Sequence, residues 1–267
     1  GDGGTNPFES PRKNDYPVPA LRRTGYGDLA FEGLQKAGYH PFTGPAGMIS
    51  QDYDNRPACS YCGYCTGHGC WNDAKASTLV SAIPKAEATG KLEIRTNSRV
   101  VKILSNDKGQ ITGVQYLDAD GVLQEQPAGV VILSTYVYEN VRLLLLSKSD
   151  YYPNGLINSN GQVGKHYMSH AYVARNGLFP GKRLNLWSGT TGQAVAMDDL
   201  NGDNFDHTGL GFIRGAVIFA SNGNLPIGQS RVVAPSAPAW GADYKRWINT
   251  NAGSVGSIFA QVAVRRC

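Results

Sequence analysis

Four of the five cysteines lie close together, at positions 59, 62, 65 and 70. Two, two and four residues separate them, and three glycines among these supply turns. Short Cys-x-x-Cys steps can bring thiolates to one centre, and four thiolates are what an iron-sulfur cluster or a structural zinc needs. The spacing of Cys59, Cys62, Cys65 and Cys70 therefore predicts a metal or cluster site in residues 59–70.

Other uses of these cysteines fit the spacing less well. Cysteines three apart rarely reach disulfide geometry without strain, and bridges inside so short a loop remove little chain entropy. Zinc sites usually pair two Cys-x-x-Cys steps across a longer separation, whereas one compact run is closer to iron-sulfur usage. The sequence alone leaves zinc open, and His68 could replace one sulfur.

The composition excludes several classes of protein. With 267 residues, 17% charged and 41% hydrophobic, the chain is globular, and its 33 glycines and 14 prolines indicate many loops. The net charge of +4 is not gathered into a basic run, so nucleic acid is not expected as a partner. No apolar stretch reaches the roughly 18–20 residues of a membrane span, so we expect any membrane association to come through a partner.

The ends of the chain suggest a fragment. It starts at Gly1 rather than Met, and it stops at Cys267 directly after a strand-like apolar run. We expect a piece of a longer enzyme.

The first 150 residues mix helix and strand signals. Residues 1–20 carry four prolines and read as an extended surface arm. Apolar spacing predicts helices over residues 28–37 and 78–89, the second capped by Ser77 and kinked at Pro84. Short β-branched runs predict an antiparallel meander, with strands at 92–95, 99–104 and 111–117 and a further hairpin turn at 118–121.

A buried strand followed by a helix is predicted next. Residues 128–133 are apolar after Gly129 and lead through Ser134, Thr135 and Tyr136 into a leucine-rich helix. A strand that feeds a helix in this way is half of a parallel α/β unit, and nucleotides bind at the carboxyl edge of such strands. We expect a cofactor at this edge.

The remainder favours a second, sheet-rich lobe with strands near 194–197, 215–220 and 257–264. The fold class expected is α/β with α+β mixing, divided into residues 1–150 and 151–267. The glycines from Gly209 to Gly215 do not form a dinucleotide fingerprint, because the spacing is one residue too long and no strand precedes them.

Several segments together resemble the glucose-methanol-choline oxidoreductases, and more narrowly the branch of gluconate 2-dehydrogenase and related membrane-bound sugar dehydrogenases. The similarity covers residues 6–170 well and the rest loosely. Its most specific part is the cysteine loop beside the strand-helix segment. The segments that carry it are Asn6-Pro-Phe-Glu-Ser-Pro-Arg12, Gly38-Tyr-His-Pro-Phe42, the loop 59–77, 92–104, 131–147 and Val163-Gly-Lys-His-Tyr-Met-Ser-His170.

The resemblance implies an FAD-dependent dehydrogenase that takes hydride from a sugar or sugar acid. An iron-sulfur cluster and a cytochrome would carry single electrons onward to quinone. It also implies a small subunit and a cytochrome c subunit as partners, and a periplasmic location on the membrane through such a partner.

Four residues acquire cofactor roles from the resemblance. Val100 would touch the adenine part of FAD through its backbone, with Val101 beside it. Ser134 and Thr135 match the small residues that approach the adenosine. The wider family usually has Gly next and Pro five positions later, where this chain has Tyr136 and Val141.

In the related glucose-dehydrogenase branch three cysteines hold the cluster. Cys59, Cys65 and Cys70 match them, and Cys62 is extra.

Two parts of the family pattern are missing from this sequence. The N-terminal G-x-G-x-x-G that seats the FAD pyrophosphate is absent, as is the C-terminal region with the catalytic His. None of the five histidines, at positions 40, 68, 166, 170 and 207, matches it, so we assign no catalytic residue and expect this chain to be catalytically incomplete. The rival hypotheses are a non-catalytic zinc-stabilised binding module and a small secreted disulfide protein.

Overall fold

The computed structural model describes residues 5–63, 65, 67–187, 189–222, 226–229, 231, 233 and 235–262. Helices and strands are mixed, which confirms the expected fold class, and each strand pair in this part of the chain is antiparallel. The chain forms two compact units, residues 1–85 with 169–267 and residues 86–168. The functional division predicted near residue 150 stays a prediction.

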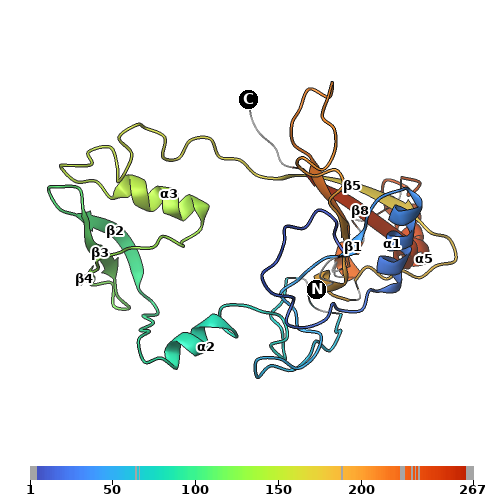
Figure 1. The fold of residues 1–267 in the computed structure, drawn as a ribbon, viewed down its shortest axis with the longest axis horizontal. Helices are drawn as coiled ribbons and strands as arrows, with labels where there is room; N and C mark the ends of the chain where they lie inside the picture. Colours follow the sequence, from blue (N-terminus) through green and yellow to red (C-terminus); the bar gives the residue numbers. More distant parts are fainter. Residues whose placement is uncertain are drawn as a thin grey trace. The chain divides into compact units, whose positions relative to one another are not determined.

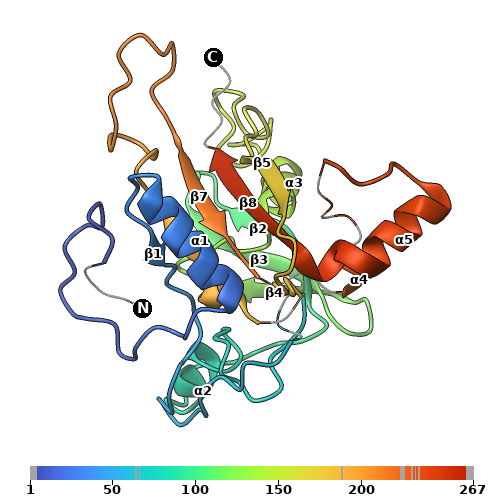
Figure 2. The ribbon, with the colours of Figure 1, turned by 90° about the vertical axis from the view of Figure 1, so that its right-hand side faces the viewer.

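The first unit is built on a five-stranded sheet with the order β1-β6-β7-β8-β5 (Figures 1 and 2). The strands expected at 194–197, 215–220 and 257–264 are confirmed with small shifts, although residues 263 and 264 lie outside the described residues. The short β1 comes from the N-terminal third and pairs with β6. The strands are β1 Phe42–Thr43, β5 Ala171–Leu178, β6 Val195–Met197, β7 Ala216–Ala220 and β8 Val255–Val262.

Helix α1, Gly25–Lys36, packs on this sheet (Figure 2). The sequence predicted a start at residue 28, but Thr24 caps the helix earlier by accepting a hydrogen bond from the Gly27 N–H at 3.1 Å. The Thr24 hydroxyl also donates to the side-chain oxygen of Asn222 at 2.7 Å. One side chain therefore both begins the helix and ties it to the end of β7.

The buried side of α1 fixes its position. Tyr26 and Ala30 join Leu186 and Ala220 in one core cluster, and Leu34 joins a second with the side chains of β6. Burying a side chain of this size contributes about 2 kcal/mol. Gly256 in β8 allows the close approach, since a Cβ there would lie 2.8 Å from the Tyr26 ring.

Helix α5, Gly241–Asn251, was not predicted from the sequence. None of its side chains is buried, and its partly buried apolar face is limited to Tyr244, Trp247 and Ile248. A short 3-10 turn, η2 Ala252–Ser254, leads from it into β8. The remaining short helical segments of this unit are η1 Thr191–Gln193 and α4 Pro226–Gln229.

Residues 5–20 contain no helix or strand, as the arm prediction requires.

The second unit contains the predicted meander (Figure 1). Its strands are β2 Arg99–Ser105, β3 Ile111–Leu117 and β4 Leu123–Pro127, in that order in the sheet. Helix α3, Val137–Leu146, packs on β2. The core consists of Ile103, Leu143 and Leu156, with partly buried apolar neighbours.

Ser147 links α3 to β2. Its hydroxyl accepts a hydrogen bond from the Ile103 N–H at 2.9 Å and donates to the Leu143 carbonyl at 2.7 Å. The side chain is 1% exposed. An unpaired buried N–H is costly, and no strand among the described residues pairs with this edge of β2. The serine hydroxyl therefore supplies the acceptor that the Ile103 N–H needs.

The buried strand predicted at residues 128–133 is wrong. No strand forms there, and Val130 and Ile132 are 79% and 83% exposed. A strand apolar on both faces needs neighbours on both edges, and within the described residues none pairs with this segment. The helix that follows it is confirmed as α3.

Two further predictions fail locally. The helix expected over 78–89 shrinks to α2, Ala82–Glu87, and Leu79 is 71% exposed. Pro84 falls in the first turn of this short helix, where the missing N–H costs little, so it marks a start and no kink. Residues 92–95 form no strand.

Among the described residues, no helix combines the length and apolar character that crossing a membrane requires.

Tyr26 generates a prediction about alkaline stability. Burial raises the pKa of its hydroxyl to about 12. The protonated hydroxyl donates a hydrogen bond to the Ser257 carbonyl at 2.5 Å. The folded state therefore keeps its proton between the unfolded pKa of about 10 and about 12, and stability falls by about 2–3 kcal/mol as the pH rises through this window.

Tyr26→Phe should remove this alkaline loss while lowering stability at pH 7 by about 1–3 kcal/mol, because the Ser257 carbonyl loses its donor. Urea unfolding of both proteins from pH 8 to 12 measures it. An equal alkaline slope in Tyr26→Phe contradicts the assignment.

Candidate functional site

The cysteine loop is fastened at its base in the first unit. The N–H of Cys59 donates to the Ile49 carbonyl at 2.9 Å, and the Ile49 N–H donates to the Ala74 carbonyl at 3.1 Å. The Ala76 N–H donates to the Gly47 carbonyl at 2.6 Å. These bonds hold the two ends of the loop together.

Lys75 holds the middle of the loop. Its ammonium donates to the carbonyls of Cys65 at 2.9 Å and His68 at 2.8 Å. The Asn72 amide donates to the Ala58 carbonyl at 2.9 Å. The role of Lys75 could not be predicted from sequence, because it acts on backbone oxygens that only the folded loop turns towards it.

The four thiols predicted as ligands are half-buried and free. Cys59 and Cys70 pack against the apolar side chains of Val18, Ile49 and Ala74. In the described part of the chain, no three His, Cys, Asp or Glu side chains come together as a metal site. Tyr64 and Thr66 lie outside the described residues. As the loop stands, the sulfurs do not present a ligand set, and metal binding would require them to rearrange.

The thiols nevertheless influence one another. Burial raises the pKa of Cys59 and of Cys65, and the neighbouring thiols add to both effects. Burial also acts on Cys70, but hydrogen bonds from the main-chain N–H groups of Lys75, Asn72 and Ala74 outweigh it and lower the pKa of that thiol. Of these three thiols, Cys70 is thus the one that most readily becomes a thiolate.

The candidate adenine contacts lie on β2, in the second unit. Val100 pairs with Tyr116 and packs on the core, whereas Val101 is the extra residue of a bulge between Val100 and Lys102. The bulge leaves Val101 outside the register of β2 and β3. Of the two valines, Val101 is therefore the one with backbone groups free of that ladder.

The candidate adenosine contacts precede α3, and both are exposed. The Thr135 hydroxyl and N–H donate to the Asn140 side-chain oxygen at 2.6 Å and 2.9 Å. The Ser134 hydroxyl makes no hydrogen bond within the described residues. Ser134 is thus available to a ligand, while Thr135 is committed to the start of the helix.

Tyr136 has an uncommon backbone conformation, with φ 75° and ψ 151°. This region is occupied almost only by glycine, and a side chain there costs about 1–3 kcal/mol. The resemblance places a glycine of the wider family at this position, so the geometry explains that preference. Here the Tyr136 ring packs at 5.3 Å on Tyr138, which in turn contacts Tyr167.

The second unit supplies separate groups of the kinds that an adenosine site uses, and their role in binding FAD stays a prediction. A bulge offers unpaired backbone groups, Ser134 offers a hydroxyl, and the exposed side chains of Val130 and Ile132 offer apolar surface. An adenine ring needs such edge contacts and an apolar face.

Two histidines of the first unit, His40 and His207, lie against neighbouring side chains. His40 Nδ1 lies 2.7 Å from an Asp199 oxygen, and the side chain is exposed. His207 lies 4.1 Å from the Phe205 ring, between centroids, with its Nε2 buried and unpartnered. The assignment of no catalytic base stays a prediction.

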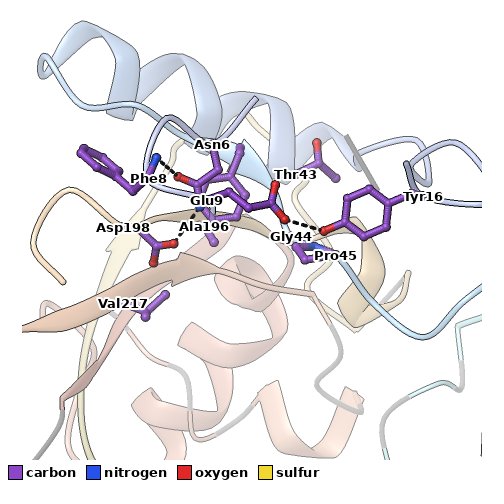
Figure 3. A pocket seen from close by; sticks show the side chains of 11 residues that line it. Asn6, Phe8, Glu9, Tyr16, Thr43, Gly44, Pro45, Ala196, Asp198 and Val217 are labelled. Carbon is purple, nitrogen blue, oxygen red and sulfur yellow. Dashed lines mark hydrogen bonds between the residues drawn. The ribbon is translucent and has the colours of Figure 1, made fainter. Parts of the chain in front are cut away.

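A cavity beside the N-terminal arm was not foreseen (Figure 3). It encloses about 410 Å³ between the arm and the strands β1, β6 and β7. Polar groups from the arm and from the sheet line it together. No sequence motif indicates it, because its residues are distant in the chain, and Asn6 and Asp198, for example, lie 192 positions apart.

Comparisons with known proteins match most of the chain. A family model described as GMC oxidoreductase matches residues 31–171. The gluconate 2-dehydrogenase flavoprotein of Pantoea cypripedii is 34% identical over 249 residues, which is 91% of this chain and 40% of that protein. The fructose dehydrogenase large subunit of Gluconobacter japonicus is 29% identical over 195 residues, 72% of this chain and 34% of that subunit.

A third relative, the 2-methyl-1,2-propanediol dehydrogenase of Mycolicibacterium austroafricanum, is 30% identical over 184 residues, 66% of this chain and 31% of that enzyme. The matches thus span between 31% and 40% of the length of these three relatives.

The thiol environments predict an order of alkylation. In the reduced, metal-free chain at pH 8, iodoacetamide should modify Cys70 before Cys59 and Cys65, because Cys70 has the larger thiolate fraction. Peptide mapping by mass spectrometry after short exposures measures the order. In urea the difference should vanish, since unfolded thiols share a pKa of about 8.5. Modification of Cys59 or Cys65 before Cys70 in the folded chain contradicts the assignment.

Proposed function

This chain belongs to the GMC oxidoreductase family, and from that premise we propose that it is part of an FAD-dependent dehydrogenase that oxidises an alcohol group of a sugar or sugar acid. The observation that carries the proposal is the 34% identity to a gluconate 2-dehydrogenase flavoprotein across 91% of the chain. The activity is proposed for the complete protein, because the matches span less than half of each named relative.

The second unit would hold the adenosine end of FAD. Val101 would offer backbone groups from the bulge, Val100 would support it from the core, and Ser134 would meet the sugar. Thr135 holds the start of α3 in place through Asn140. Bound flavin supplies a two-electron acceptor that can pass electrons on singly.

The cysteine loop is proposed as the ligand set of an iron-sulfur cluster. The spacing of the four cysteines supports it, as does their mutual influence within one small loop. The packing of Cys59 and Cys70 on apolar side chains argues for a rearrangement on binding, which is ordinary for metal sites coupled to folding. A zinc-stabilised, non-catalytic module is the second candidate, since the same thiols suit zinc.

Partner subunits and location complete the proposal. Two of the relatives are named as a flavoprotein and as a large subunit, which supports the presence of partner subunits. That these are a small subunit and a cytochrome c subunit that passes electrons to quinone is proposed from the family resemblance. A periplasmic position, held at the membrane by that partner, rests on the family resemblance alone.

Ser134→Trp tests the flavin site. An indole at this exposed position should block the adenosine without disturbing the fold, so the complete protein should lose most of its FAD while the control Thr96→Trp, also exposed in this unit, keeps it. Flavin absorbance after gel filtration and circular dichroism measure both effects.

The unaltered protein should also lose its flavin absorbance when D-gluconate or D-fructose is added without oxygen. Full FAD content in Ser134→Trp would refute the assigned site. A flavin that neither these substrates nor other sugars and sugar acids reduce would refute the proposed activity.

Cys65→Ser tests the metal. If the loop holds an iron-sulfur cluster, this change should remove most of the iron and acid-labile sulfide from anaerobically purified complete protein. Cys267→Ser is the matched control, because that cysteine lies outside the loop. Zinc in stoichiometric amount without sulfide would establish the rival module and end the cluster proposal.

A further inference from the structure

Lys75 is a half-buried cation beside the cysteine loop, and it makes no ion pair in the described part of the chain. Its ammonium donates instead to the main-chain oxygens of Cys65 at 2.9 Å and His68 at 2.8 Å. An ammonium has three donors, so one N–H of Lys75 finds no acceptor among the described residues. A partly buried cation without a counter-ion is stabilised when an anion forms beside it.

The loop contains no carboxylate that could neutralise this charge. Residues 59–70 include no Asp or Glu. Asp73 is the nearest acid in the sequence, and within the described structure it makes no ion pair with Lys75. The side chains of the loop that become anionic most readily are therefore its four cysteines. The main-chain N–H of Lys75 already donates to the Cys70 sulfur.

Backbone bonds anchor Lys75 at the fastened base of the loop. The carbonyl of the preceding residue, Ala74, accepts from the Ile49 N–H at 3.1 Å. Lys75 itself forms an isolated antiparallel bridge with Met48. The sulfurs of residues 59–70 can therefore rearrange around a metal while the main chain of Lys75 keeps its place and its side chain reaches into the loop.

A metal bound by these sulfurs would be an anion. The donor set suits such a centre, because the four thiols are free, although the sulfurs must move to converge. A divalent metal held by three or four thiolates carries a net negative charge, since each thiolate brings one negative charge. Thiolate-bound iron-sulfur clusters are anionic for the same reason. A fixed positive charge beside a partly desolvated centre of this kind stabilises it.

We propose that Lys75 is the counter-ion of an anionic metal–thiolate centre in residues 59–70. The inference rests on the proposed metal role of the cysteine loop and names the residue that balances its charge. Lys75 acts through the cysteines, as a positioning residue, and is not a ligand itself. The role is the same for a cluster and for zinc, because both are anionic when thiolates bind them.

Cobalt tests the inference, because thiolate-bound Co²⁺ has a charge-transfer absorption that aqueous Co²⁺ lacks. The full chain, reduced with a phosphine and freed of metal, is titrated with Co²⁺ at low salt without oxygen. Lys75→Gln removes the charge, while its amide can still donate to a loop carbonyl. It should bind Co²⁺ about tenfold more weakly than the unaltered chain. Lys75→Arg keeps the charge and should retain most of the affinity.

A salt series separates charge from loop structure. Raising the salt concentration should narrow the difference between Lys75→Gln and the unaltered chain, because salt screens the attraction. A loss of affinity that came only from a disturbed loop would not follow the salt concentration. Lys36→Gln removes an equal charge from the exposed end of α1 and is the matched control, with unchanged affinity expected. Circular dichroism checks that each variant is folded.

The proposal is overturned if Lys75→Gln binds Co²⁺ as tightly as the unaltered chain, if its weaker binding is independent of salt, or if Lys75→Arg loses as much affinity. An unaltered chain without the charge-transfer absorption at saturating Co²⁺ would refute this inference together with the metal role of the loop. Zinc without sulfide in the complete protein would refute the cluster alone, and Lys75 would then be the counter-ion of a zinc centre.

Discussion

The packing of α1 on the sheet is the contact on which the first unit depends. Tyr26 and Leu34 bury their side chains against β6, β7 and β8 and their neighbours, and Thr24 fixes where the helix begins. The chain on either side of α1 is the arm that forms the cavity and the strand β1 that lines it. With the helix displaced, the arm, β1 and the segment that leads to the cysteine loop would lose their common support.

The second unit depends on a single side chain in a comparable way. Ser147 supplies the acceptor that the edge of β2 needs and anchors the end of α3. The bulge at Val101 arises instead from the register of β2 against β3. β2 is an edge strand of its sheet, so backbone groups along its outer side need partners other than a strand.

The cysteine loop shows two competing uses of sulfur. A half-buried thiol packs well on apolar side chains, as Cys59 and Cys70 do, and a metal ligand must leave such contacts to become a thiolate. The backbone donors around Cys70 already favour the thiolate, whereas burial opposes it at Cys59 and Cys65. Metal binding would therefore be opposed by burial at Cys59 and Cys65 and favoured by the backbone hydrogen bonds at Cys70.

The sequence by itself determined the local features: the meander of β2, β3 and β4, the helices α1 and α3, the extended arm, the cysteine spacing and the family. Each follows from periodicity, turn residues or motif within about twenty positions. Only the tertiary structure decided that residues 128–133 form no strand, that the helix around Pro84 is confined to Ala82–Glu87, and that Asn6 meets Asp198 across the cavity. These outcomes depend on contacts between segments that are distant in the chain, and the sequence of one segment alone does not specify such contacts.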